Sequence, residues 1–245
     1  MPPDTSEASD FEARLEREKL DAIKELAYGA SHEINNPLAN IAARAQTLLR
    51  DEQQPDRRLA LESIHQQAMR AHEMISDLML FARPPALDIG PVEVATLLKN
   101  VSDHFAPVCE RRNIRVQLVS LNESIELQAD RQQLEIAFRA IFQNAIEAIG
   151  TDGAIEVSLV EPTAGTDQLT INITDTGVGM TDQVRRHLFS PFYSGREAGR
   201  GLGFGMSKSW RIVTDHGGTI GVSSSPGEGS AISVMLPCDR NPHEK

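Results

Sequence analysis

The 245-residue sequence has little cysteine and no long hydrophobic run. Its two cysteines, Cys109 and Cys238, are far apart and share no metal-ligand spacing, so we expect two reduced thiols in a cytoplasmic protein. No apolar run approaches the roughly 20 residues of a membrane-spanning helix, and residues 1–10 lack the pattern of a signal peptide. We therefore expect no direct membrane insertion. Any membrane input must come through a partner or through sequence outside this chain.

Positive charge is also scarce. Lysine and arginine number 24 against 35 aspartates and glutamates, which gives a formal net charge of −11. Nucleic acid and anionic membrane both require a basic surface, so neither is expected as a main partner. A nucleotide is not excluded, because it needs only a local positive pocket.

The first third of the chain has the pattern of a helical hairpin. Apolar residues recur every three or four positions over residues 11–50, and at about 1.5 Å per residue such a helix would be about 60 Å long. A second predicted helix follows the turn Asp51–Asp56 and ends near Arg83, because Pro84 and Pro85 cannot continue it. A lone hairpin leaves an apolar stripe exposed, so we predict a homodimer whose two hairpins form a four-helix bundle.

After a linker at Pro84–Pro91 the pattern becomes mixed. Strands grouped in hairpins, rather than alternating with helices, predict an α+β domain with a helical layer on one mixed sheet. The predicted domains are a flexible tail at 1–10, the hairpin at 11–88 and the α+β domain at 89–245. Its expected helices are Thr96–Val108, Arg131–Ile149, Val184–Phe189 and Phe204–Thr214, and its expected strands are Ile114–Val119, Ile125–Gln128, Ala154–Val160, Gln168–Thr174, Thr219–Ser223 and Ala231–Leu236.

The segment Asp175–Gly179 (Asp-Thr-Gly-Val-Gly) stands at the end of a predicted strand. A carboxylate there can accept a hydrogen bond from an exocyclic amine such as adenine N6. The two glycines, Gly177 and Gly179, let the backbone approach a flat ring closely. Taken alone, the segment fits an ordinary turn better.

A second glycine-rich segment, Gly199–Gly205 (Gly-Arg-Gly-Leu-Gly-Phe-Gly), leads directly into a predicted helix. Four glycines at strict alternation before a helix expose backbone amides to an anion, which favours phosphate binding over a flexible loop. The segment is neither a Walker A loop nor a Rossmann fingerprint, because no Gly-Lys-Ser/Thr follows it and no strand immediately precedes it.

Asn144 lies on a strongly apolar predicted helix. A buried amide needs a hydrogen-bond partner, and its carbonyl oxygen also suits Mg²⁺. For an isolated asparagine, a structural role is the better interpretation.

The segment Ser31–Leu38 (Ser-His-Glu-Ile-Asn-Asn-Pro-Leu) lies within the first long helix. Glu33 follows His32 directly, and Asn36 lies one turn further on the same face. Pro37 removes the amide that would bond the carbonyl of Glu33, so we expect a kink beside the histidine. A histidine can act as a nucleophile once a neighbouring base takes its ring proton.

Together, His-Glu-x-x-Asn-Pro, the later Asn, Asp-x-Gly-x-Gly and Gly-x-Gly-x-Gly resemble the sensor histidine kinases of two-component systems, most of all the nitrogen-regulation kinases. The resemblance covers roughly residues 15–237. It implies a dimeric helical phosphoacceptor domain joined to a catalytic domain with the Bergerat ATP-binding α/β sandwich. It also implies ATP and Mg²⁺ as cofactors, and a response regulator receiver domain and an upstream sensor as partners.

The resemblance assigns a role to each matching residue. His32 matches the phosphoacceptor, Glu33 the acid that accepts the imidazole proton, and Asn36 the residue used in phosphatase activity toward the regulator. Asn144 matches the Mg²⁺ ligand and Asp175 the adenine-reading aspartate. The remaining matches are Gly177 and Gly179 beside adenine, Phe192 in the box that anchors the ATP lid, Arg196 where members carry a lid lysine near the phosphates, Arg200, Gly201, Leu202, Gly203 and Gly205 on the second glycine loop, and Ser230 where members often have threonine near adenine.

Three positions depart from the family pattern. Ala140 stands where many members have a second asparagine, Arg200 replaces a common threonine, and Glu147 sits where some members have lysine. None of these changes removes the nucleophile, the base or the adenine contact.

The resulting expectation is an autophosphorylating protein-histidine kinase that donates its phosphoryl group to a response-regulator aspartate and also dephosphorylates that regulator. Transfer within or between subunits stays open, because it depends on the handedness of the Asp51–Asp56 turn. A non-catalytic dimeric scaffold is one alternative, which absence of nucleotide binding would favour. ATP-hydrolysing machines of the gyrase and heat-shock chaperone kind are another, but they carry a glutamate where this chain has Ala140, and they lack the His-Glu hairpin.

Overall fold

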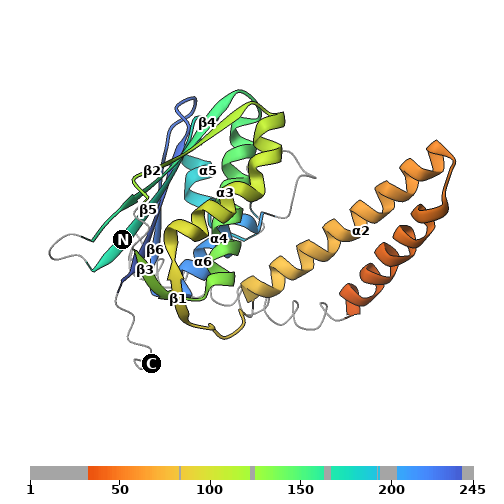
Figure 1. Cartoon of the computed structure of the whole chain (residues 1–245), viewed down its shortest axis with the longest axis horizontal. Coiled ribbons are helices and arrows are strands. Elements are labelled where there is room, and N and C mark those ends of the chain that lie inside the picture. The colour runs from red at the N-terminus through yellow and green to blue at the C-terminus, as the bar shows by residue number, and fades with distance from the viewer. Residues whose placement is uncertain are drawn as a thin grey trace, which may run out of the picture. The chain divides into compact units, whose positions relative to one another are not determined.

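The computed structural model describes residues 33–82, 84–121, 125–162, 167–191, 193 and 203–238. The chain divides into two compact units, residues 1–85 and 86–245. The first is a helical hairpin and the second is built of helices and strands (Figure 1). Over the described ranges, no helix is both long and apolar enough to cross a membrane.

The hairpin consists of a helix over residues 33–51 and helix α2 (Pro55–Ala82). The expected first helix is therefore confirmed over 33–51, and residues 11–32 lie outside the described ranges. The connection is only 52–54, shorter than the predicted turn Asp51–Asp56. Pro55 can begin α2 because a first helical residue needs no amide hydrogen for the helix. The backbone N–H of Gln54 donates to Glu52 Oε1 at 2.8 Å inside this short turn.

Small residues form the seam between the two helices of the hairpin. Ala42, Ala45 and Ala68 are buried there, and alanine lets two helix backbones approach closely. His65 of α2 crosses the seam, and its Nδ1 lies 3.1 Å from the carbonyl oxygen of Ala42. This contact shows which residues of the antiparallel pair lie at one level.

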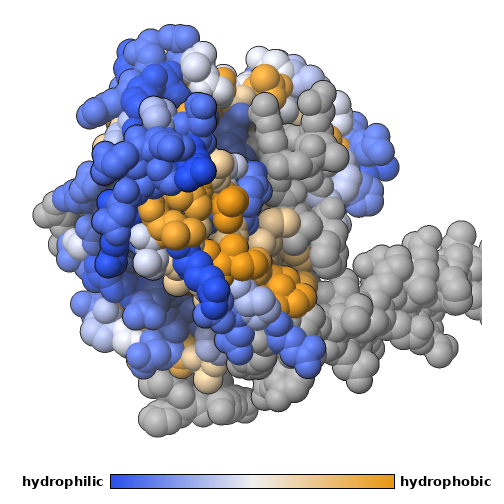
Figure 2. Space-filling view, turned by 90° about the vertical axis from the view of Figure 1, so that its right-hand side faces the viewer, coloured by the Kyte–Doolittle hydropathy of each residue, from blue (hydrophilic) through white to orange (hydrophobic). Residues whose placement is uncertain are grey.

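An apolar stripe of the hairpin remains exposed. Ile34, Ile41 and Leu48, spaced by seven residues, are 40%, 45% and 61% exposed, and Ile64 of α2 is 48% exposed. Hydrophobic surface between hydrophilic borders is visible in Figure 2. The expectation that one hairpin cannot cover its own apolar surface is thus confirmed.

The second unit is organised around a five-stranded sheet with strand order β2-β4-β5-β7-β6. Strands β2 and β4 are parallel, and the other neighbours are antiparallel. Alternate residues of the central strand, Leu169, Ile171 and Ile173, are buried on one face of the sheet. The strands are β2 (Ile114–Val119), β4 (Gly153–Val160), β5 (Gln168–Asp175), β6 (Thr219–Ser224) and β7 (Ser230–Pro237).

Three helices pack on that buried face of the sheet (Figure 1), as the predicted mixed α+β layer requires. They are α3 (Val94–Arg111), α4 (Arg131–Ile149) and α6 (Gly205–Asp215). Phe105 of α3 and Phe142 of α4 stack with ring centroids 6.0 Å apart. The hydroxyl of Ser209 on α6 donates to the carbonyl of Ala137 on α4 at 2.9 Å, so α4 is joined to both neighbours.

Two expectations of local structure were wrong. The linker Pro84–Pro91 does not extend to Pro91, because β1 (Gly90–Glu93) pairs with β3 (Glu126–Ala129) in a separate two-stranded sheet. Proline is tolerated at the edge of a sheet, where its missing amide breaks no ladder bond. The short helix α5 is Asp182–His187 rather than Val184–Phe189, because the Thr181 hydroxyl caps it by accepting from Val184 N–H at 3.3 Å.

Buried Asp130 joins three segments that are distant in sequence. Its Oδ1 accepts from Gln133 N–H at 3.0 Å and caps α4, and its Oδ2 accepts from Asp88 N–H at 3.0 Å. Its own N–H donates to Nε2 of buried His216 at 3.0 Å. His216 must then carry its hydrogen on Nδ1, which lies 2.8 Å from the Ile212 carbonyl. The end of the linker, the start of α4 and the end of α6 therefore form one hydrogen-bonded joint.

Replacing Asp130 should destabilise this joint. Asp130→Ala removes a helix cap and the acceptor of the Gln133 and Asp88 amides, so we expect a loss of about 2 kcal/mol in the free energy of unfolding, measured by urea denaturation. Asp130→Ser keeps a capping oxygen and should lose clearly less. Equal losses in the two variants would show that the cap contributes nothing.

Candidate active site

Asp175 ends the central strand β5 and is only 3% exposed. Its backbone pairs with Ile155 of β4 on one side and with Ser230 of β7 on the other. Asp175 and Ser230, both expected near adenine and distant in sequence, are thus brought side by side.

The Asp175 carboxylate is held by hydrogen bonds. Oδ1 accepts from Gly177 N–H at 2.8 Å, and the backbone and hydroxyl of Ser230 also donate to the carboxylate. Burial raises the pKa of the Asp175 carboxyl above its ordinary value, and these hydrogen bonds oppose the rise without cancelling it. The side chain is fixed in direction, as a hydrogen-bond acceptor for a flat polar ligand must be.

Only glycine fits at positions 177 and 179, because a side chain would collide with neighbouring backbone. A Cβ on Gly177 would lie 2.6 Å from the backbone carbon of Ala148 on α4, and one on Gly179 would lie 1.9 Å from the carbonyl oxygen of Ser225. Gly179 also has a positive φ of 65°, which side chains rarely adopt. The loop after β5 therefore packs directly against the end of α4 and against the β6–β7 turn.

Ser224, for which the sequence predicts no role, holds these two turns together. Its hydroxyl accepts from Met180 N–H at 2.9 Å, donates to the Gly229 carbonyl at 2.7 Å and lies 3.1 Å from the Ser230 hydroxyl. Gly227 N–H adds a bond of 2.7 Å to the Val178 carbonyl. A single serine at the end of a predicted strand does not indicate such a role from the sequence.

Asn144 lies beside the same loop. It is half-buried on α4, one turn before Ala148, whose carbonyl accepts from Val178 N–H at 3.1 Å. Residues four apart share a helix face, so Asn144 stands next to the loop that begins at Asp175. Ala140, one further turn back, is also half-buried and offers no ligand atom from its side chain.

The donor set fits Mg²⁺ bound chiefly through phosphates. Where the chain is described, no group of three or more His, Cys, Asp or Glu side chains could hold a metal ion. Mg²⁺ commonly keeps several waters and uses one or two protein ligands together with phosphate oxygens. A single amide oxygen from Asn144 matches that arrangement.

The second glycine loop is described only at its end. Gly203 has a φ of 72°, and a Cβ there would lie 2.2 Å from the carbonyl oxygen of Tyr193. The Tyr193 ring packs on His187 with centroids 5.1 Å apart. The two ends of the intervening segment therefore meet at α6, which begins at Gly205. The predicted residues Phe192, Arg196, Arg200, Gly201 and Leu202 lie outside the described ranges.

In the hairpin, Glu33 and Asn36 are exposed on the first helix. The helix continues through Pro37. His32 lies outside the described ranges, and the kink beside it stays a prediction.

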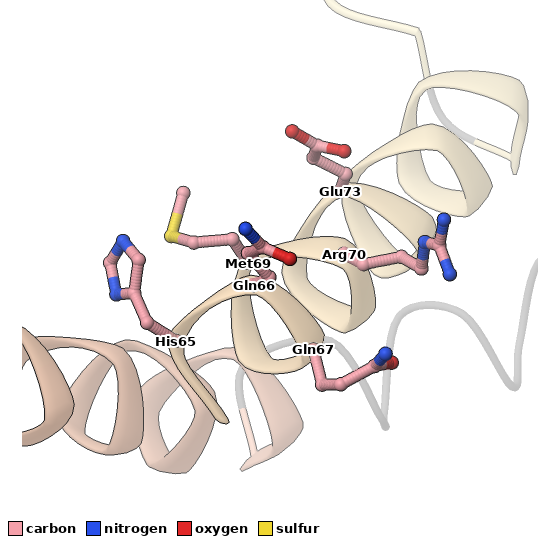
Figure 3. A pocket seen from close by; sticks show the side chains of 6 residues that line it. All are labelled: His65, Gln66, Gln67, Met69, Arg70 and Glu73. Atoms are coloured by element: carbon pink, nitrogen blue, oxygen red, sulfur yellow. The ribbon is translucent and has the colours of Figure 1, made fainter. Parts of the chain in front are cut away.

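A hollow of about 450 Å³ lies along α2, lined by His65, Gln66, Gln67, Met69, Arg70 and Glu73 (Figure 3). These side chains project from one helix in several directions. None of the predicted nucleotide-binding residues is among them, so the nucleotide is not assigned to this hollow.

Two family models match the chain. Residues 22–86 match the His Kinase A (phospho-acceptor) domain, and residues 129–240 match the Histidine kinase-, DNA gyrase B-, and HSP90-like ATPase family. The sensor histidine kinase ZraS of Escherichia coli (strain K12) is 31% identical over 224 residues, which cover 90% of this chain and 47% of ZraS. The chain belongs to the sensor histidine kinases of two-component systems. It spans about a third to a half of the length of the curated relatives it matches.

Solved structures share the fold. ShkA, solved at full length in complex with AMPPNP, matches with a TM-score of 0.77 at 20% identity, over 89% of this chain and 47% of ShkA. ThkA, solved in complex with the response regulator protein TrrA, matches with a TM-score of 0.66 at 21% identity, over 99% of this chain and 69% of ThkA. The predicted order, a helical region followed by a Bergerat-type α+β sandwich, is confirmed.

The raised pKa of Asp175 predicts a stability change with a definite sign. A raised folded-state pKa means that the protonated carboxyl favours the folded state relative to the ionised carboxylate. This contribution to stability is complete below the unfolded-state pKa, and it is lost as pH rises through the folded-state pKa. Asp175→Asn should therefore be more stable than the parent at neutral pH, in urea denaturation. The difference should vanish below about pH 4, where the unfolded aspartate is also protonated.

Asp103→Asn serves as the control, because Asp103 is an exposed carboxylate of α3. It should stay within about 0.5 kcal/mol of the parent. A neutral-pH loss of stability in Asp175→Asn would contradict the argument from burial.

Proposed function

We propose that this chain is an ATP-dependent protein-histidine kinase that phosphorylates its own His32. One observation carries the proposal: buried Asp175 leads into a loop whose Gly177 packs on Ala148, one helical turn after Asn144, in a chain that also has a phosphoacceptor-type hairpin. We assign the hairpin unit, up to residue 85, to dimerisation and phosphotransfer, and the unit from residue 86 onward to catalysis. The two free thiols fit a cytoplasmic location.

ATP would bind with adenine against the loop after β5. Asp175 accepts a hydrogen bond from adenine N6, and Ser230 lies next to Asp175. Gly177 and Gly179 let the loop pack against α4 and the β6–β7 turn, which holds the carboxylate in place. Asn144 would hold Mg²⁺, which when bound would supply positive charge to the phosphates. The phosphates of ATP would bind at the second glycine loop and the ATP lid. The residues assigned to these two segments are Phe192, Arg196, Arg200, Gly201, Leu202, Gly203 and Gly205.

The chemical step is an in-line displacement. A ring nitrogen of His32 attacks the γ-phosphorus, a nitrogen–phosphorus bond forms, and the bond from phosphorus to the bridging oxygen of ADP breaks. Glu33 takes the proton released from the imidazole ring. The loop amides and Arg196 would offset the negative charge that develops on the transferred group, and Mg²⁺ held by Asn144 would add positive charge there.

The phosphoryl group would then pass to an aspartate on the receiver domain of a response regulator, while an upstream sensor supplies the signal. The ThkA complex with a response regulator supports this class of partner. A homodimer follows from the stripe of Ile34, Ile41 and Leu48, since a seven-residue repeat is what a second hairpin would cover.

The first test of the function is incubation with γ-labelled ATP and Mg²⁺. The parent should acquire an acid-labile, base-stable label, as a phosphoramidate is. His32→Gln should lose the label and keep ATP binding, whereas Asp175→Asn should weaken ATP binding by about 1–3 kcal/mol in calorimetry. Label retained in His32→Gln would defeat the assignment of the acceptor.

A second prediction separates two activities on one helical turn. Removing a general base typically costs about 10²–10⁴ in rate, so Glu33→Ala should cripple self-phosphorylation. Asn36 is four residues after His32, which places the two side chains about 6 Å apart. Its amide can hold the water that attacks a regulator phosphoaspartate. Asn36→Ala should therefore slow regulator dephosphorylation and leave self-phosphorylation largely intact.

The melting temperature of Asn36→Ala decides the alternative that Asn36 only supports the helix at Pro37. In that case both activities and the stability would fall together. Equal losses of the two rates, or a parent without phosphatase activity, would contradict the proposed role.

A further inference from the structure

The hairpin contains two buried polar atoms whose hydrogen-bonding capacity is unused. They are Oδ1 of Asn35 on the first helix and Nδ1 of His72 on α2; within the described part of the hairpin neither has a partner. Both residues are half-buried, so the rest of each side chain extends toward the surface. Buried polar atoms are rarely left unpaired, and each such atom requires an explanation.

The register of the hairpin places these two residues at one level. His65 of α2 meets the carbonyl of Ala42 across the seam. Asn35 precedes Ala42 by seven residues, and His72 follows His65 by seven. Seven residues are about two helical turns, and the helices run antiparallel, so both steps lead to the same level on the facing sides.

The two atoms are complementary in chemistry. The imidazole Nδ1 can carry a hydrogen, whereas the amide oxygen of asparagine only accepts. A hydrogen bond from His72 Nδ1–H to Asn35 Oδ1 would use the capacity of both atoms. His65 already uses its own Nδ1 in the same way, with a backbone carbonyl as its acceptor.

Asn35 and His72 lie level with the helical turn that carries the proposed reactive residues His32, Glu33 and Asn36. Asn35 lies between Glu33 and Asn36, and Pro37 withholds the amide that the carbonyl of Glu33 would otherwise accept from. The helix is therefore weakened by one hydrogen bond at the turn that must present His32 and Asn36 in a fixed direction. A tie from α2 at Asn35 would replace the lost constraint.

We propose that His72 is a positioning residue: its Nδ1–H donates to Asn35 Oδ1 and fixes the orientation of the turn that carries His32, Glu33 and Asn36. The inference rests on the proposed kinase function. The proposed role of His72 needs no contact with ATP or with the phosphoryl group, because His72 acts through Asn35. Loss of the bond misaligns the imidazole of His32 with the γ-phosphorus and the amide of Asn36 with its water.

The test compares His72→Leu, which removes the donor, with His72→Asn, whose amide nitrogen stands close to the place of Nδ1. His65→Leu is the matched control, since it removes an equivalent seam histidine two turns away. For each variant, the rate of self-phosphorylation at saturating ATP, the KM for ATP, the rate of regulator dephosphorylation and the melting temperature are measured.

His72→Leu should lower both rates about 10-fold, in keeping with the cost of a small misplacement, with the KM for ATP unchanged. His72→Asn should recover most of the loss. His65→Leu should lower the melting temperature as much as His72→Leu does and leave both rates near those of the parent. Equal rate losses at positions 65 and 72, or no recovery in His72→Asn, would overturn the inference.

A double-mutant cycle with Asn35→Leu tests the pair itself. If the two side chains act through one bond, the double variant should be no slower than the poorer single variant. Multiplied losses would overturn the pairing even if His72 matters. A parent without acid-labile label would instead overturn the proposed function, and this inference with it, so the two failures are distinguishable.

Discussion

Asp175 can be buried at the end of β5 only because backbone approaches it closely on both sides. On one side Gly177 packs against α4. On the other side Gly229 packs so closely that a Cβ on it would lie 2.0 Å from the carbonyl oxygen of Asp175. A buried carboxylate is costly unless its oxygens are satisfied, and the donors come from Gly177 and Ser230. The loop, the end of α4 and the β6–β7 turn are thereby held in contact, and the position of Asn144 follows from that contact.

The two units reach their structures by different means. In the hairpin, small side chains bring two helices together and leave apolar surface to be covered by something else. In the α+β unit, the sheet and three helices cover one another, and long-range hydrogen bonds such as Asp130 to His216 join distant segments. Asp88 belongs to that network, so the stretch of linker that can bend freely is shorter than its proline-rich sequence indicates.

Much of the fold could be predicted from the sequence, because the spacing of apolar residues and the positions of proline and glycine determine local structure. Helix α4 has the predicted bounds Arg131–Ile149, and the loop at Gly177 packs on that helix at Ala148, one turn after Asn144. Strand β1 was missed because glycine and proline indicate a linker, although pairing with β3 makes a strand of it. Ser224 and His216 were missed for another reason: their partners are far away in sequence, and no local pattern records such contacts.

The order of strands in the sheet has a consequence for how the unit is assembled. Strand β7 follows the other four in sequence but lies inside the sheet, between β5 and β6. Strand β6 is therefore held in the sheet only through β7, and Asp175 receives its Ser230 bonds only once β7 is in place. During synthesis, the helical layer and β2, β4 and β5 can collapse early, while the adenine end of the site must wait for residues 230–237. Non-local pairing of this kind slows folding, and until it occurs β5 presents an unpaired edge to other chains.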